Sequence, residues 1–230
     1  MTSPGESARS DQLSVIITGA TGMVGEGVLL ECLESPEVER VLMINRRPAP
    51  RRHPKLTELI VPNFLELDRF QDQLRDYDAC FFCAGVSSRG MSETLYNHLT
   101  YNTTLRFAKT LCAVNPHTTF IYISGALTDS SEKGRIMWAR VKGRTENALL
   151  RCGFEHAYNF RPGFMRPTRG QQNIHGYYKV IGALYPVLRL VAPHHVSTMR
   201  QVGRAMINAA AKGYPHTTLE ICDINTLAAA

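Results

Sequence analysis

Three glycines follow a short apolar segment near the start of the chain and precede a segment with helical character. The string is Thr18-Gly19-Ala20-Thr21-Gly22-Met23-Val24-Gly25. Because glycine lacks a Cβ, such a turn lets a ligand approach the backbone closely and leaves N–H groups at a helix N-terminus free for an anion. The pattern predicts a diphosphate-binding turn, with Gly25 packing the helix close to a sheet. The alternative is a glycine-rich turn without a ligand.

A basic segment follows the second expected strand and bears on the choice of ligand. Proteins that prefer NAD carry a carboxylate here that binds the adenosine ribose, whereas this chain reads Asn45-Arg46-Arg47. Guanidinium groups match phosphate oxygens in bidentate geometry. We therefore expect NADP(H) to be preferred, with Arg46 or Arg47 on its 2′-phosphate, while NAD(H) remains possible. A solvated basic loop is the alternative.

Three further residues are candidates for catalytic chemistry. Ser124 ends an apolar strand-like segment, where it could polarise a carbonyl group or serve as a turn residue. Trp138 and Lys142 are four residues apart, so they share one face of an expected helix. Indole donates a hydrogen bond but exchanges no proton. Trp138 is thus either a core aromatic residue of a pseudo-active site or an aromatic wall beside a flat substrate.

Strand and helix signals alternate along the chain, which predicts an α/β fold with a doubly wound, mainly parallel sheet and helices on both faces. We expect Met1–Gln12 to be a disordered tail and 13–230 to be a single domain, with a small C-terminal substrate-side cap from about residue 162. The strands are expected at 13–18, 38–45, 58–62, 78–84, 118–124, 154–160 and 217–222. The helices are expected at 23–34, 68–76, 92–114, 136–151, 177–191 and 198–212.

Over about residues 13–225 the chain resembles the short-chain dehydrogenase/reductase superfamily, whose fold is a Rossmann sheet. Thr18–Gly25 resembles its phosphate loop, and Arg161-Pro162-Gly163 resembles a motif of its extended members. Val141-Lys142-Gly143 followed by Glu146 is similar to atypical extended members related to the Tat-interacting-protein oxidoreductases and to bacterial NAD-dependent epimerase/dehydratase-like proteins.

The resemblance implies roles for individual residues. Lys142 would hold the nicotinamide ribose, and Ser124 would be the serine of strand five. The residues that the resemblance places against the cofactor, besides the glycine turn and Lys142, are Asn63, Phe64, Cys83, Ala84, Gly85, Pro162 and Gly163. Reductases of this superfamily also use Tyr-x-x-x-Lys, in which the phenol delivers a proton. This chain has Trp138 in place of that tyrosine, and Tyr96 and Tyr101 are candidates to replace it, with Tyr101 the better placed by analogy.

These observations favour an NADP-dependent oxidoreductase or epimerase-like enzyme for a small carbonyl or alcohol substrate, working without the usual tyrosine. The alternative is a non-catalytic, cofactor-binding sensor or scaffold, which Trp138 supports. Arg166, Arg169 and His175 lie in an expected site-forming loop, where they would favour an anionic ligand unless the loop is simply solvated. A homodimer or a protein partner is possible.

Composition and charge exclude other classes of protein. The chain has 230 residues, of which 44% are hydrophobic and 20% are charged, as in globular domains. Five of its six net positive charges lie between Arg46 and Lys55, so they form one loop, and nucleic-acid binding is not predicted. No apolar run reaches the roughly 18 residues of a membrane span. No secretory signal is apparent, so we expect a cytoplasmic protein.

The cysteines and histidines indicate neither a disulfide framework nor a metal site. The six cysteines are scattered, and the histidines lack ligand spacing. Cys80 and Cys83 should point to opposite faces of a strand, which argues against a redox or zinc pair.

Overall fold

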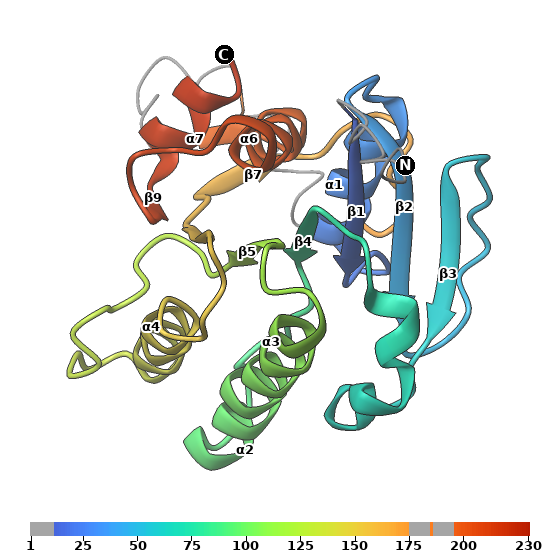
Figure 1. The fold of residues 1–230 in the computed structure, drawn as a ribbon. Helices are drawn as coiled ribbons and strands as arrows, with labels where there is room; N and C mark the ends of the chain where they lie inside the picture. Colours follow the sequence, from blue (N-terminus) through green and yellow to red (C-terminus); the bar gives the residue numbers. More distant parts are fainter. Residues whose placement is uncertain (1–11, 175–184, 186–195) are drawn as a thin grey trace, which may run out of the picture.

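The computed structural model describes residues 12–174, 185 and 196–230. The expected N-terminal tail, apart from Gln12, and the helix expected at 177–191, apart from Tyr185, lie outside the described residues. A seven-stranded sheet with the order β3-β2-β1-β4-β5-β6-β9 forms the centre (Figure 1). Its strands are β1 (Leu13–Thr18), β2 (Val38–Asn45), β3 (Leu56–Ile60), β4 (Ala79–Phe82), β5 (Thr119–Ile123), β6 (Ala157–Phe160) and β9 (Thr218–Leu219).

Every pair of neighbouring strands in this sheet is parallel, which confirms the predicted fold class. The inner strands are apolar on both faces because helices cover both faces. Along β1, Val15 and Ile17 belong to one core, whereas Ile16 belongs to the other.

Helices from the two ends of the chain cover one face of the sheet, and helices from its middle cover the other face (Figure 1). The first core holds apolar residues of α1 (Met23–Glu34), α6 (Met199–Lys212) and α7 (Ile221–Leu227). The second core holds residues of η1 (Phe64–Leu74), α3 (Thr103–Val114) and α4 (Met137–Leu149). A small second sheet pairs β7 (Phe164–Arg166) with β8 (Val196–Thr198).

The sheet changes direction of winding between β1 and β4. The chain passes from β1 to β2 on one side, and β4 then pairs with β1 on the other side. Open parallel sheets bind ligands at the carboxyl ends of the strands beside such a point. Thr18, the last residue of β1, pairs with Phe82 of β4, so the glycine turn and the Cys83–Gly85 segment leave the sheet together.

Several elements differ from expectation. The helix expected at 92–114 consists of α2 (Glu93–Asn97), a π-helical turn η2 (His98–Asn102) and α3. The segment expected to be a strand at 217–222 contains only two strand residues. The backbone then enters α7, because Glu220 and Asp223 form a capping box that starts a helix.

Candidate functional site

The glycine turn joins β1 to α1 and is packed tightly on the end of β4. Gly19 has φ +71°, and a Cβ there would lie 2.6 Å from the carbonyl oxygen of Cys83 and from the nitrogen of Ala84. The Gly22 N–H donates to the Gly19 carbonyl at 2.9 Å, which closes the turn. Gly22 is also the N-cap residue of α1. Because it has no side chain, it leaves the first N–H groups of the helix without a side-chain cap.

Gly25 is required by the turn itself. A Cβ at this position would lie 2.8 Å from the Ala20 nitrogen and closer still to the Gly19 carbonyl group. The sequence suggests that Gly25 brings α1 close to the sheet; the structure shows that it brings α1 close to the backbone of the turn. The result is a backbone cradle at a helix N-terminus, which fits a diphosphate group.

A cavity of about 300 Å³ opens beside this cradle. Most of the predicted cofactor residues line it: Gly19, Thr21, Gly22, Arg46, Asn63, Phe64, Cys83, Ala84 and Gly85. His98, Leu99 and Thr103, at or next to the π-helical turn, complete one wall and were not predicted. π-turns recur at functional sites, but the sequence carries no clear signal for one.

Other predicted residues lie near the cavity without lining it. Met23 is buried, and its carbonyl accepts a hydrogen bond from Gln171. Val24 is half-buried, and Arg47 is exposed next to Arg46. Pro162 lies farther along the strand edge, where its carbonyl accepts from the Ala126 N–H at 3.1 Å.

The cations of the basic segment are not equivalent. Arg51 pairs with the buried Glu26 at 3.0 Å, and Arg52 donates to two backbone carbonyls. Lys55 donates to the Ser35 carbonyl at 2.7 Å. Arg46 and Arg47 are both exposed, and Arg46 faces the cavity. Arg46 and Arg47 are therefore the cations of this segment that remain available to a phosphate group.

Ser124 and Lys142 meet at the carboxyl end of β5. The Lys142 ammonium donates to the Ser124 carbonyl oxygen. The Ser124 hydroxyl donates to the Phe160 carbonyl at 3.1 Å, and this side chain is buried. A Cβ at the neighbouring Gly125 would find a single atom within 4 Å, Lys142 Nζ at 3.9 Å, so the backbone beside the ammonium is bare.

Burial lowers the pKa of Lys142 to about 8, although the Glu146 carboxylate acts in the opposite direction. Glu146 is itself buried and receives both Nε and Nη2 of Arg161. Arg161 also pairs with Glu220 at 3.0 Å, and its hydrogen bond with Glu146 raises the pKa of the guanidinium. The sequence singled out Arg161 and Glu146 only as parts of motifs and did not predict this network.

Trp138 is half-buried one turn before Lys142. Tyr96 and Tyr122 are buried phenols, and burial raises the pKa of each, so both are held in the protonated form. Tyr122 packs in the second core. Tyr101 is partly buried and packs against the same core. Arg166 is exposed, with its guanidinium 5.3 Å from the ring centroid of Tyr185, and His175 lies outside the described residues.

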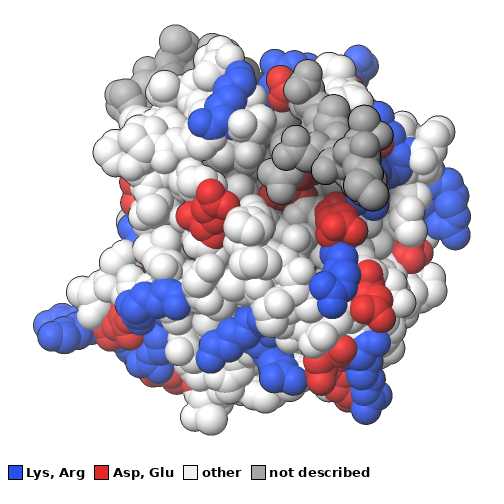
Figure 2. Space-filling view, viewed as in Figure 1, with Lys and Arg blue, Asp and Glu red and all other residues white. Residues whose placement is uncertain are grey.

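The charged side chains and the Cys80–Cys83 pair can be placed on the described part of the structure. Basic and acidic side chains are interspersed on the face shown in Figure 2. Within the described ranges, no three His, Cys, Asp or Glu residues gather as a metal site, and no helix has the length and apolar character needed to cross a membrane. Cys80 and Cys83 pack on opposite sides of the sheet, as expected.

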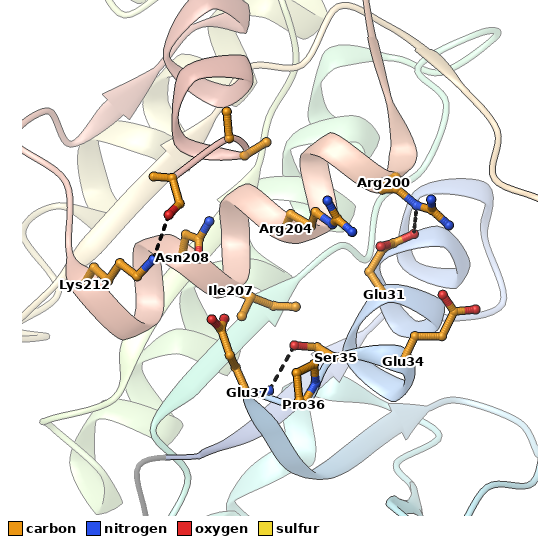
Figure 3. Close-up of a pocket in the computed structure, with 13 residues that line it drawn as sticks. Glu31, Glu34, Ser35, Pro36, Glu37, Arg200, Arg204, Ile207, Asn208 and Lys212 are labelled. Carbon is orange, nitrogen blue, oxygen red and sulfur yellow. Dashed lines mark hydrogen bonds and ion pairs between the residues drawn. The ribbon is translucent and has the colours of Figure 1, made fainter.

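A separate cavity of about 420 Å³ lies between α6 and the end of α1, as Figure 3 shows. The residues after α1 lead into the start of β2. This cavity therefore lies at the amino ends of the parallel strands, whereas the glycine turn lies at their carboxyl ends. Its charged walls are partly paired: Arg200 lies 3.5 Å from Glu31, and Lys212 donates to the Ala230 carbonyl (Figure 3).

The winding of the sheet and the glycine cradle at its switch point define a dinucleotide-binding α/β protein of the short-chain dehydrogenase/reductase type. The sequence profile of the NAD dependent epimerase/dehydratase family matches residues 15–130. The chain belongs to this family.

Individual relatives are distant. The chain is 28% identical over 161 residues to "Protein fmp52-1, mitochondrial" of Aspergillus terreus, covering 68% of each chain. Its fold is similar to ADP-L-glycero-D-manno-heptose-6-epimerase of Helicobacter pylori (TM-score 0.66, 15% identity, 95% of this chain and 81% of that one). It is also similar to a short chain dehydrogenase of Burkholderia cenocepacia solved with NADP (TM-score 0.65, 15% identity, 96% and 94%).

Proposed function

We propose that the chain binds NADP(H) in preference to NAD(H) and is an oxidoreductase or epimerase-like enzyme for a small carbonyl or alcohol substrate. The observation that carries the proposal is the glycine turn, in which a Cβ at Gly19 or Gly25 would lie within 3 Å of backbone atoms, and in which Gly19 and Gly22 line the cavity at the start of α1. Gly22, the N-cap residue of α1, lines this cavity and has no capping side chain, so the N-terminus of the helix is open there to an anion such as a diphosphate.

The lining of the site suggests how the cofactor is held. The cradle would take the diphosphate, and the cavity beside Asn63, Phe64 and Cys83–Gly85 would take the adenosine. Arg46 would bind the 2′-phosphate, with Arg47 next to it, because Arg51, Arg52 and Lys55 already have protein partners. Fold neighbours were solved with NADP, as for the Burkholderia dehydrogenase, or with NAD, as for the Bordetella bronchiseptica enzyme WbmF, so the proposed preference rests on Arg46 and Arg47.

The chemistry proposed for this chain centres on Lys142. A bound nicotinamide supplies or accepts a hydride. Lys142 would hold the ribose, and its pKa near 8 would also suit it to exchange a proton with a substrate oxygen near neutral pH. The bare backbone at Gly125 leaves room for a substrate beside the ammonium. Ser124 would contribute through its carbonyl, which orients Lys142, since its hydroxyl is turned to Phe160.

A cofactor-binding sensor or scaffold is the second candidate function, and Trp138 is the observation that favours it. Oxidation of NADPH against a panel of carbonyl compounds distinguishes the two. Turnover by the unmodified chain supports the enzyme. Binding without turnover, with activity appearing only in Trp138→Tyr, supports the sensor, and Trp138→Phe is the control that adds no phenol hydroxyl.

Domain organisation, location and assembly also remain proposals. We propose one domain from residue 13 to 230, with a cap from about residue 162, and a cytoplasmic location. The six free cysteines agree with a reducing compartment, whereas the word mitochondrial belongs to the name of the Aspergillus relative. Limited proteolysis, fractionation of cells and light scattering test the domain, the location and a possible homodimer.

A further inference from the structure

A short segment after β7 is bound to the start of α1, far away in the sequence. We call residues Thr168–Asn173 the strap. The Thr168 N–H donates to Gln171 Oε1 at 2.7 Å, which folds the strap on itself. Gln171 is buried, and its Nε2 donates at 2.7 Å to the carbonyl of Met23, the first residue of α1. The strap is thus attached to the helix that begins at the glycine cradle.

One carboxylate provides most of this attachment. Glu26, in the first turn of α1, is 2% exposed. It accepts from the Gln172 N–H at 2.9 Å and from the Asn173 N–H at 2.7 Å. It also receives Arg51 from the basic segment at 3.0 Å. Three parts of the chain, α1, the basic segment and the strap, therefore share one buried charge.

The same groups surround a cavity of about 330 Å³. Thr21 lines it from the glycine turn, Arg51 and Arg52 from the basic segment, and Gln172 and Asn173 from the strap. Thr21 also lines the proposed adenosine cavity, so the two cavities adjoin at the turn. A nucleotide that rests on the turn would therefore lie beside the strap.

Capping of the helix does not explain Glu26. The N-cap position of α1 is Gly22, and Glu26 directs its carboxylate to groups outside the helix. A buried carboxylate next to a phosphate-binding turn is costly unless cations and N–H groups neutralise it. Arg51 and the strap N–H groups supply that neutralisation. The placement of Glu26 therefore depends on the placement of the strap, and the placement of the strap depends on Glu26.

We propose that Glu26 is a positioning residue that couples nucleotide binding at the glycine turn to the ordering of the strap. The strap leads from the Arg161-Pro162-Gly163 segment and β7 on the substrate side, so Glu26 links the cofactor end of the site to its substrate end. This inference rests on the proposed nucleotide binding. Coupling of this kind is reciprocal: the factor by which NADPH stabilises the strap equals the factor by which an ordered strap strengthens NADPH binding.

Hydrogen exchange at the Gln172 and Asn173 amides tests the coupling. In the unmodified chain, saturating NADPH should slow exchange at both amides about tenfold or more, a typical coupling factor. Glu26→Gln removes the charge and one acceptor, so NADPH should then slow exchange less than about threefold. Its NADPH affinity, measured by calorimetry, should fall by the factor of slowing seen in the unmodified chain.

Two variants separate coupling from a general structural effect. Glu34→Gln changes an exposed carboxylate of the same helix and should leave affinity and exchange unchanged. Glu26→Asp keeps the charge but shortens its reach, so it reports on the coupling if Glu26→Gln does not fold; it should also reduce the slowing. If NADPH binds the unmodified chain and slows strap exchange equally in the Glu26 variants, the inference is wrong while nucleotide binding stands. If neither NADPH nor NADH binds the unmodified chain, the proposed function itself fails.

Discussion

Gly25→Ala is the substitution for which the structure predicts the largest effect on nucleotide binding. The added methyl group would lie 2.8 Å from the Ala20 nitrogen and still closer to the Gly19 carbonyl. Ordinary contacts of this kind are about 3.5 Å or more, so the turn has to move by about 1 Å. Gly19 has no space to yield, because it already rests on the backbone of Cys83 and Ala84.

The energetic consequence follows from this overlap. Overpacking costs about 1–3 kcal/mol, of which roughly 1 kcal/mol is offset by the better helix propensity of alanine. A turn displaced by about 1 Å no longer directs its N–H groups at a diphosphate, so we expect NADPH affinity to fall about 100-fold or more, equivalent to about 2.7 kcal/mol. The assay is isothermal titration of NADPH into each folded variant.

Gly27→Ala is the matched control on the same helix. Its methyl group would meet the Met199 side chain of α6, with Cε at 2.7 Å and Cβ and Cγ at 3.1 Å, and none of the three nearest atoms belongs to the backbone of the turn. This variant should gain the same helix propensity and bind NADPH within about threefold of the unmodified chain. If Gly25→Ala is folded and binds NADPH as tightly as Gly27→Ala, the cradle is not the diphosphate site.

Three other predictions concern charged groups. Replacing Arg46 and Arg47 together by alanine removes a charge-assisted contact with the 2′-phosphate, so the affinity for NADPH, measured by titration calorimetry, should fall about 30-fold or more. The affinity for NADH should change less than threefold. Equal losses for the two cofactors would refute a 2′-phosphate contact. Lys142 should lose its proton near pH 8, so the extent of acylation of this amine, followed by mass spectrometry, should rise through that pH. In urea the midpoint of acylation should shift back toward pH 10.5. A midpoint above pH 10 in the folded chain contradicts the proposed proton exchange. Glu146→Ala removes the buried partner of Arg161 and leaves it only the exposed Glu220 as an acidic partner, so it should lower the free energy of unfolding by about 3 kcal/mol in urea titrations. A loss below about 1 kcal/mol would show that the buried pair contributes little.

Local patterns in the sequence were sufficient to predict a doubly wound, mainly parallel sheet. The expected bounds of β1, α1 and β2 agree with the structure, because each is a strongly apolar or periodic segment closed by glycine or proline. Later elements agree less well at their ends. The π-turn at His98–Asn102 interrupts a segment whose composition is helical throughout, and its extra residue per turn leaves no mark that the sequence pattern could reveal.

The candidate site was predictable where backbone geometry decides it and less so where tertiary contacts do. Gly19 and Gly25 could be identified because only glycine tolerates their surroundings. The partners of Glu26, which lie 25 and about 146 positions away, could not be found from spacing. The hydroxyl of Ser124 also turned out to face Phe160, since the adjacent strand offers a carbonyl acceptor that the sequence does not reveal.

A crystal structure grown with NADPH tests the central claim most directly. We predict that the diphosphate oxygens lie within hydrogen-bonding distance of backbone N–H groups between Gly22 and Gly25, with Arg46 or Arg47 on the 2′-phosphate. NADPH found instead in the cavity between α1 and α6, or bound with the glycine turn uncovered, would contradict the account.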